Sequence, residues 1–248
     1  MALPEHYQPR TDLLADKIIL VTGAGDGIGR AASIAYAEHG ATVLLLGRTV
    51  SKLEQLYDDI LAAGLPEPGI IPADMGQLGI KTLDEIAEVI GERYTHLDGI
   101  LHNAAILGDR IPVEHYDLAL WDQVMQVNFN GAVLLTQFLL SLMQQADSAS
   151  LLFTSATVGV TPRAYWGPYA VSKYALEGFA KLLAEELENT SAIRVNVVDP
   201  GATRTNMRHA AYPNEDPETL KPPEDLMGLY LYLMGEDSLN EHGQRFTG

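Results

Sequence analysis

Tyr169 and Lys173 lie four residues apart in the stretch YAVSKYALEGFAKLLAEEL, and a phenol beside an ammonium group can carry acid/base chemistry. Apolar residues recur through this stretch at helical spacing, so it is predicted to form an amphipathic helix. Residues four apart lie on the same face of a helix, so the two side-chain heads can reach one common point. Two interpretations are open at this stage: a surface pair without a role, or a tyrosine acid/base whose pKa the lysine lowers.

A second group of residues is suited to binding phosphate. The stretch VTGAGDGIGR follows the first apolar run and opens a helical pattern, and Gly23, Gly27 and Gly29 stand within it. Glycines there would let the backbone approach a pyrophosphate at the positive end of the helix. A glycine-rich stretch alone can be a simple turn, but its place between the first predicted strand and helix favours dinucleotide binding.

The second predicted strand bears on which dinucleotide binds. Sites that prefer NAD(H) usually place Asp or Glu about 20 residues past the glycines, where it binds the ribose 2′-hydroxyl. Here the strand ends in LLLGRT, with Gly47 at that place and Arg48 next. A guanidinium suits a 2′-phosphate, whereas Asp26 puts a carboxylate near the phosphates and argues the other way. The sequence favours NADP(H) and leaves NAD(H) open.

Short apolar runs alternate with longer helical patterns, and these elements must position the side chains above. The runs are nearly continuous in apolar residues, as expected of parallel strands covered on both faces. Repeated βα units predict an α/β fold, a Rossmann-type doubly wound parallel sheet in a three-layer αβα sandwich, as a single domain over residues 1–248. Strands are predicted at 17–23, 41–47, 69–74, 97–105, 149–155 and 193–201, with a short terminal run at 244–246, and helices at 30–38, 50–63, 80–93, 119–145, 168–188 and 226–235.

The least regular region is residues 202–225, which are rich in proline and polar side chains. In folds of this class, ligands bind beyond the carboxyl ends of the strands, where this region begins. It is therefore predicted to be a segment that covers the substrate, within the single domain.

Composition excludes several classes of function. The 33 acidic residues against 16 Lys and Arg give a net charge of −17, which argues against a nucleic-acid partner. The chain has no cysteine, so disulfides and thiolate catalysis are excluded. The histidines show no metal-ligand spacing, and no metal is expected. No apolar run is long enough to cross a bilayer and no signal-peptide core is present, so we expect no membrane partner and a cytoplasmic location.

Five motifs in order resemble one family. They are TGxxxGxG ending at Gly29, Asn103 after the fourth strand, Asn128 in the long helix, YxxxK at Tyr169–Lys173, and DPGATRT after the sixth strand. Over nearly its whole length the chain resembles the short-chain dehydrogenases/reductases. Within that family it is most similar to the YciK-type bacterial oxidoreductases, on the stretches HYQP, WGPYAVSK and YLYLMG.

The resemblance implies a reaction and a site. Tyr169 would protonate the oxygen of a carbonyl substrate during reduction and act as the base on an alcohol in reverse. Lys173, with the positive nicotinamide, would lower the pKa of Tyr169 and hold the ribose, while Asn128 would anchor a water in a proton relay. Like many family members, the protein would form a homodimer or homotetramer. The residues implied in cofactor binding are Gly23, Gly27, Ile28, Gly29, Arg48, Asp74, Met75, Asn103, Ala104, Tyr169, Lys173, Pro200, Gly201 and Thr203.

The chain departs from the family pattern at the residue that orients the substrate carbonyl. The family has a serine thirteen residues before the tyrosine, but this chain has Ala156 there, between Ser155 and Thr157. Either the strand end shifts so that Ser155 supplies the hydroxyl, or the site lacks one donor, which can cost about 10²–10³ in rate. Ser155 is the candidate catalytic residue. A catalytically weak or inactive nucleotide-binding sensor or scaffold protein of the same fold is the alternative function.

Overall fold

Seven parallel strands form one sheet in the computed structural model, which describes residues 1–248. The order across the sheet is β3-β2-β1-β4-β5-β6-β7, so the chain winds outward in both directions from the neighbouring strands β1 and β4. The predicted doubly wound Rossmann-type fold is confirmed. The strands are β1 (Ile18–Thr22), β2 (Thr42–Gly47), β3 (Gly69–Pro72), β4 (Gly99–His102), β5 (Ala149–Thr154), β6 (Ile193–Asp199) and β7 (Arg245–Thr247).

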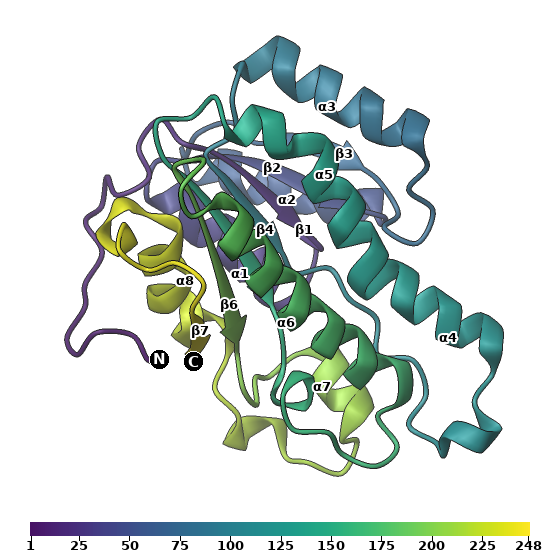
Figure 1. Ribbon diagram of the computed structural model, residues 1–248. Coiled ribbons are helices and arrows are strands. Elements are labelled where there is room, and N and C mark those ends of the chain that lie inside the picture. Colours follow the sequence, from purple (N-terminus) through teal and green to yellow (C-terminus); the bar gives the residue numbers. More distant parts are fainter.

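Helices cover both faces of this sheet, which gives the three layers that Figure 1 shows. Helices α3, α5 and α6 pack against one face, and α1, α2 and α8 pack against the other. The helices are α1 (Gly27–Glu38), α2 (Val50–Ala62), α3 (Ile80–Tyr94), α4 (Leu118–Met125), α5 (Gly131–Met143), α6 (Gly167–Leu187), α7 (Asn206–Ala211) and α8 (Met227–Met234).

The apolar runs in the sequence explain this layering. All five residues of β1 are buried, and alternate side chains point to opposite faces. Ile19 and Val21 belong to the hydrophobic core under α1, α2 and α8, whereas Ile18 and Leu20 belong to the core under α3, α5 and α6. Because both faces of the strand pack against a core, apolar residues follow one another along it instead of alternating with polar ones.

Two helices differ from the prediction. Helix α1 begins at Gly27, three residues before the predicted start at residue 30, because the glycine stretch itself forms the first helical turn. The predicted helix at 119–145 is instead α4 and α5 joined by a π-helical turn, Gln126–Asn130. Turns of this kind are frequent at functional sites, and this one contains Asn128.

The two ends of the chain lie side by side, as Figure 1 shows. The amino group of Met1 donates a hydrogen bond of 2.6 Å to the carbonyl oxygen of Arg245, and the amide of Thr247 donates to the carbonyl oxygen of Met1. These bonds hold β7 at the open edge of the sheet beside β6. None of the helices combines the length and the apolar character that crossing a membrane requires.

Candidate active site

A cavity of about 740 Å³ opens at the carboxyl ends of the strands, beyond the paired strands β1 and β4, from which the chain winds in opposite directions across the sheet. Doubly wound sheets bind their ligands at this place. The structure brings together in its wall all but two of the residues predicted from the sequence, and the exceptions are Gly29 and Asn128. The predicted residues that line it are Gly23, Gly27, Ile28, Arg48, Asp74, Met75, Asn103, Ala104, Ser155, Tyr169, Lys173, Pro200, Gly201 and Thr203.

The glycine stretch has a backbone geometry at the start of α1 that suits an anion. Gly23 and Gly27 have φ angles of +68° and +51°, a backbone region that suits glycine. A side chain at Gly29 would bring its first carbon within 2.3 Å of the carbonyl oxygen of Gly23, so Gly29 permits the start of α1 to pack closely against Gly23 and Asn103. The side chain of Asp26 does not cap the helix, so the first amides of α1 are free to bind a pyrophosphate.

Thr22 is a residue of this site that the sequence analysis missed. Its hydroxyl donates to the carbonyl oxygen of Leu101 at 3.3 Å and accepts hydrogen bonds from the amides of Asn103 and Ala104, both at 3.0 Å. The side-chain amide of Asn103 donates in turn to the carbonyl oxygen of Thr22. These bonds fix the two predicted adenosine-side residues, Asn103 and Ala104, against the glycine stretch. The threonine at the head of TGxxxGxG was the available signal.

Asp26 and Arg48 lie at the end of the cavity beside α2. The carboxylate of Asp26 pairs with the ammonium of Lys52 and accepts bonds of 3.0 and 3.2 Å from the side-chain amide of Asn206. Partial burial alone would raise the pKa of Asp26, but the bonds from Lys52 and Asn206 outweigh it and lower this pKa. The charge of Asp26 is therefore compensated, whereas exposed Arg48 makes no ion pair and no hydrogen bond.

Tyr169 and Lys173 face the cavity from the first turns of α6, as predicted. The ammonium of Lys173 lies 5.7 Å from the centre of the Tyr169 ring and donates a bond of 2.7 Å to the carbonyl oxygen of Thr154. Their exposed fractions are 8% for Tyr169 and 2% for Lys173, so both are shielded from water. The Tyr169 hydroxyl has no hydrogen-bond partner in the protein and is free to meet a substrate oxygen.

Lys173 by itself does not lower the pKa of Tyr169, and its combined effect with the positive nicotinamide stays a prediction. Burial raises the pKa of Tyr169 well above its usual value, and the negative charge of Asp199 raises it further. Burial also lowers the pKa of Lys173 to about 8, against the opposing effects of Glu177 and Asp199. Desolvation disfavours both charged forms, and it outweighs the attraction that the sequence argument relied on.

The side chain of Asn128 is hydrogen-bonded to the backbone of the loop that follows β4. Its side-chain oxygen accepts from the amide of Ile106 at 2.8 Å, and its side-chain amide donates to the carbonyl oxygen of Ile106 at 3.0 Å and to the hydroxyl of Ser172 at 3.1 Å. The π-helical turn that carries Asn128 thus ties the loop after β4 to α6. Asn128 is buried and does not line the cavity. Its role in a proton relay stays a prediction.

Neither neighbour of Ala156 presents a hydroxyl in the manner of the family's serine. The hydroxyl of Thr157 donates to the carboxylate of Asp199 at 2.8 Å. The hydroxyl of Ser155 is buried without any partner, close to Gly159. Of the two, Ser155 alone keeps an uncommitted hydroxyl, and a catalytic role for it stays a prediction.

A buried ion network beneath Lys173 was also missed from the sequence. Arg245 in β7 donates to the carboxylate of Glu177 in α6 at 3.0 Å and to that of Asp199 at the end of β6 at 2.7 Å. Asp199 also accepts from the amide of Gly201 at 3.0 Å. The network links the last strand to the loop that carries the predicted nicotinamide-side residues. Its members lie far apart in sequence, so no local pattern signals it.

Several residues of the 202–212 segment line the cavity, and Met207, Ala211 and Tyr212 among them form its substrate side together with Val158 and Trp166. The segment predicted to cover the substrate, 202–225, therefore contributes its first half, including α7, to this wall. Nowhere in the structure do three His, Asp or Glu side chains lie together as metal ligands would. The walls thus provide an anion site, a buried Tyr–Lys pair and an apolar, aromatic end, which fit a dinucleotide with a small molecule beside it.

Comparison with known proteins gives one consistent result. The sequence model described as short chain dehydrogenase matches residues 17–216. The chain is 48% identical over 241 residues to the uncharacterized oxidoreductase YciK of Escherichia coli (strain K12), covering 97% of this chain and 95% of that protein. A solved structure of yciK from E. coli matches with a TM-score of 0.94 at 48% identity, covering 98% of both chains. A short chain dehydrogenase from E. coli CFT073 complexed with NADPH matches with a TM-score of 0.93 at 48% identity, covering 96% of this chain and 99% of that one. A short chain dehydrogenase from Shigella flexneri 2a complexed with NADP also has a TM-score of 0.93, at 47% identity with the same coverage.

Proposed function

Because the chain belongs to the short-chain dehydrogenase/reductase family, we propose that it is an NADP(H)-dependent oxidoreductase that transfers a hydride between the nicotinamide and a carbonyl or alcohol substrate. The observation that carries the proposal is the buried pair of Tyr169 and Lys173 in the wall of the cavity at the carboxyl ends of the strands. Packing alone does not require a phenol and an ammonium at that place, since two buried polar heads in a core are costly without a function.

The choice of NADP(H) rests on Arg48. Its guanidinium lies at the end of the cavity beside α2, is exposed, and has no acidic partner in the chain. The carboxylate that would repel a 2′-phosphate, Asp26, is already compensated by Lys52 and Asn206. A phosphate monoester is the group that a free guanidinium at this place would bind best. The relatives solved with NADP and NADPH support the same choice.

Different residues of the chain would donate the proton, bind the ribose and bind the pyrophosphate. When bound, NADPH would supply the hydride. Tyr169 would donate the proton to the substrate oxygen, since its raised pKa keeps the phenol protonated and its hydroxyl has no competing partner. Lys173, held by the carbonyl oxygen of Thr154, would bind the ribose hydroxyls of the nicotinamide. The free amides at the start of α1 would hold the pyrophosphate.

A second function is favoured by one residue. Ala156 leaves the cavity without a hydroxyl at the family's position, which supports a nucleotide-binding sensor or scaffold with little or no turnover. Such a protein would bind NADP(H) with the same residues, and cofactor binding would change its affinity for a partner molecule. The intact Tyr169, Lys173 and Asn128 support the enzyme instead.

A screen of aldehydes, ketones and quinones with NADPH, followed by absorbance of the nicotinamide, tests the proposal. We expect at least one carbonyl compound to be reduced by the wild type. Tyr169→Phe should abolish this turnover while NADPH still binds, because the phenol supplies the proton and contributes little to affinity. Wild-type turnover in Tyr169→Phe would contradict the assigned role. NADPH binding without any turnover, by the wild type and by Ala156→Ser, would favour the sensor.

We also propose that the protein assembles at least as a homodimer, through the outer face of α4, α5 and α6. Large apolar side chains are exposed on α4 and α6: Leu118 of α4 is 77% exposed, and Val171, Tyr174 and Leu182 of α6 are 44%, 40% and 55% exposed. Exposed apolar side chains on packed neighbouring helices suit an interface between subunits. A homotetramer and a cytoplasmic location stay predictions of the sequence.

A further inference from the structure

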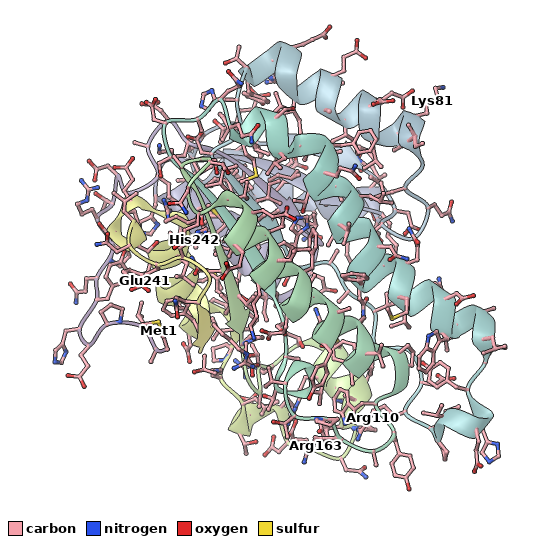
Figure 2. All side chains as sticks on the ribbon, viewed as in Figure 1. Met1, Lys81, Arg110, Arg163, Glu241 and His242 are labelled. Carbon is pink, nitrogen blue, oxygen red and sulfur yellow. The ribbon has the colours of Figure 1, made fainter.

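Two arginines contact one tyrosine near the substrate end of the cavity: Arg163 and Tyr212 line the wall, whereas Arg110 lies outside the lining, against the rings of Trp166 and Tyr212. The guanidinium carbon of Arg110 lies 4.7 Å from the ring centres of both Trp166 and Tyr212. Arg163 donates a hydrogen bond of 3.1 Å to the hydroxyl of Tyr212. Figure 2 labels both arginines and shows them near each other, at the end of the molecule that carries α7. We call Arg110, Arg163, Trp166 and Tyr212 the arginine–aromatic cluster.

Neither arginine of this cluster has an acidic partner. The only hydrogen bond of Arg110 goes to the carbonyl oxygen of Ala211, and the only one of Arg163 goes to the Tyr212 hydroxyl. A third arginine shows the contrast. Arg208 lies 4.0 Å from the ring centre of Tyr212 and forms a two-bond pair with the carboxylate of Glu215. In a chain with 33 acidic and 16 basic side chains, two neighbouring guanidinium groups without a carboxylate are unexpected.

The acidic residues of the cavity wall form no ion pair with Arg110 or Arg163. Only three line its wall, and each is bound elsewhere. Asp26 pairs with Lys52, the carboxylate of Asp74 accepts from the amide of Gly76, and Asp199 pairs with Arg245. The substrate end therefore combines apolar and aromatic walls with uncompensated positive charge.

The cluster lies close to the reacting group. The ring of Trp166 is 5.6 Å from the ring of Tyr169 and 6.0 Å from the ring of Tyr212, measured between centres. One aromatic side chain thus separates the proton donor from the guanidinium of Arg110. A small molecule whose oxygen meets Tyr169 would extend along Trp166 toward the arginines.

We propose that the substrate carries an oxyanion, a carboxylate or a phosphate, at the end remote from its reacting carbonyl, that Arg163 in the cavity wall binds it, and that Arg110 adds positive charge beside the rings of Trp166 and Tyr212. The inference rests on the proposed oxidoreductase function and names the class of its substrate. A guanidinium presents a fork of N–H donors that matches both oxyanions and always carries its charge. Contact with the rings of Trp166 and Tyr212 holds the Arg110 guanidinium in place, so its charge stays beside the cavity wall.

The two arginines differ in how far they also support the fold. Arg110 holds the end of α7 through Ala211, so replacing it can move the cavity wall. Arg163 is exposed and contacts only the Tyr212 hydroxyl, so Arg163→Gln removes the charge and keeps a donor for that contact. Arg93 is the matched control: it also has no ion pair and lies against an aromatic ring, that of Tyr94, but on α3, away from the cavity.

Paired probes that differ in charge test the inference. The first pair is 4-carboxybenzaldehyde and its uncharged methyl ester, and the second is 4-formylphenyl phosphate and 4-methoxybenzaldehyde. The ratio of kcat/KM for the charged over the uncharged member is measured with NADPH. We expect the wild type to favour the charged member of at least one pair by about tenfold or more, the effect of one charge-assisted hydrogen bond. Arg163→Gln should reduce this ratio severalfold, whereas Arg93→Gln should leave it unchanged.

A binding measurement separates this inference from the proposed function. Benzoate and phenyl phosphate are titrated calorimetrically into the protein saturated with NADP⁺. If binding depends on Arg163 but no aldehyde is reduced, the oxyanion site stands and the oxidoreductase proposal falls. If aldehydes are reduced with no preference for charge and neither anion binds in an Arg163-dependent way, the oxyanion site is overturned. The pair with the larger Arg163-dependent ratio identifies the oxyanion as carboxylate or phosphate.

Discussion

The ammonium nitrogen of Lys173 lies 2.7 Å from the carbonyl oxygen of Thr154, so the end of β5 anchors the lysine one helical turn after Tyr169. Both side chains are buried, and burial acts on them in opposite directions. It raises the pKa of Tyr169 and lowers that of Lys173 to about 8. At neutral pH the phenol of Tyr169 is therefore protonated and can give its proton to a carbonyl oxygen, and Lys173 carries the positive charge of the pair.

This arrangement predicts the pH dependence of carbonyl reduction. We expect kcat/KM to fall as the pH rises through about 8, because Lys173 then loses the proton that makes it a cation. The phenol of Tyr169 stays protonated through that range, so its ionisation does not change kcat/KM there. Rates measured from roughly pH 6 to pH 10 test this. Lys173→Met should have a lower kcat/KM and bind NADPH more weakly. Its kcat/KM should not fall as the pH rises through about 8. A wild-type profile that is flat through this range would contradict the prediction.

Arg48 predicts a preference between the two cofactors. Its guanidinium has no partner in the chain, so a 2′-phosphate would give it a charge-assisted bond that a hydroxyl cannot. We expect NADPH to bind roughly 10- to 100-fold more tightly than NADH, as one or two such bonds imply. Arg48→Ala should remove most of this difference, and Arg93→Ala, which changes an unpaired arginine on α3, should not. Fluorescence titration of both cofactors measures the affinities. Equal wild-type affinities would refute the assignment.

Some of the site could be predicted from the sequence because the relevant patterns are local. The glycine stretch and the Tyr169–Lys173 spacing each lie within one strand–helix junction or one helical turn, and the apolar runs fix where the strands end. The arginine–aromatic cluster could not be predicted in the same way. Arg110 follows β4, Arg163 precedes α6 and Tyr212 follows α7, so these side chains meet only in the folded protein.

The raised pKa of Tyr169 in the protein alone could not be predicted from the sequence for a related reason. The four-residue spacing shows that an ammonium is near, but it does not show that the phenol is buried or that Asp199 is near it. Similarly, the π-helical turn at Asn128 leaves the apolar pattern of the long helix almost unchanged, so the sequence predicts one continuous helix there. Burial and backbone irregularity are properties of the packed chain rather than of residue spacing.

Ala156 predicts that one substitution can increase the rate. Ala156→Ser would place a hydroxyl at the family's position beside the substrate carbonyl. If Ser155 does not reach that carbonyl, we expect kcat to rise by up to about 10²–10³, the effect of one donor to the substrate oxygen. Ser155→Ala should then change little, because the Ser155 hydroxyl makes no bond in the protein. A damaging Ser155→Ala together with an ineffective Ala156→Ser would show instead that Ser155 is the donor.

The exposed apolar face of α4, α5 and α6 predicts self-association. We expect sedimentation at micromolar concentration to give at least a dimer of the 27.0 kDa chain. Leu182→Glu should shift the protein toward the monomer, because it places a charge on α6 where a 55% exposed leucine would be covered by the partner. Val89→Glu is the control, since Val89 is 59% exposed on α3, outside this face. A wild-type monomer would refute the proposed assembly.

His102 predicts how the stability of the fold depends on pH. Its ring is buried, stacks on Phe153 and lies 2.8 Å from the hydroxyl of Thr136. That hydroxyl donates to the carbonyl oxygen of Ala132, so it accepts from the Nε2–H of His102. The other ring nitrogen, Nδ1, has no partner, and burial lowers the pKa of His102 to about 3.

The sign of the effect follows from proton uptake. In the unfolded chain His102 takes up a proton near pH 6.5, whereas in the folded protein it stays neutral down to about pH 3. Between these pH values the unfolded state binds more protons, so lowering the pH favours unfolding. Stability due to His102 is complete above pH 6.5 and is lost as the pH falls. Between neutral pH and pH 4.5 the wild type should lose roughly 2–3 kcal/mol more unfolding free energy than His102→Gln, which keeps a donor for Thr136 but cannot take up a proton. Urea unfolding at several pH values measures this difference. His209→Gln, at an exposed histidine, should behave as the wild type. Equal pH dependence of wild type and His102→Gln would mean that the folded protein protonates His102 as readily as the unfolded chain does.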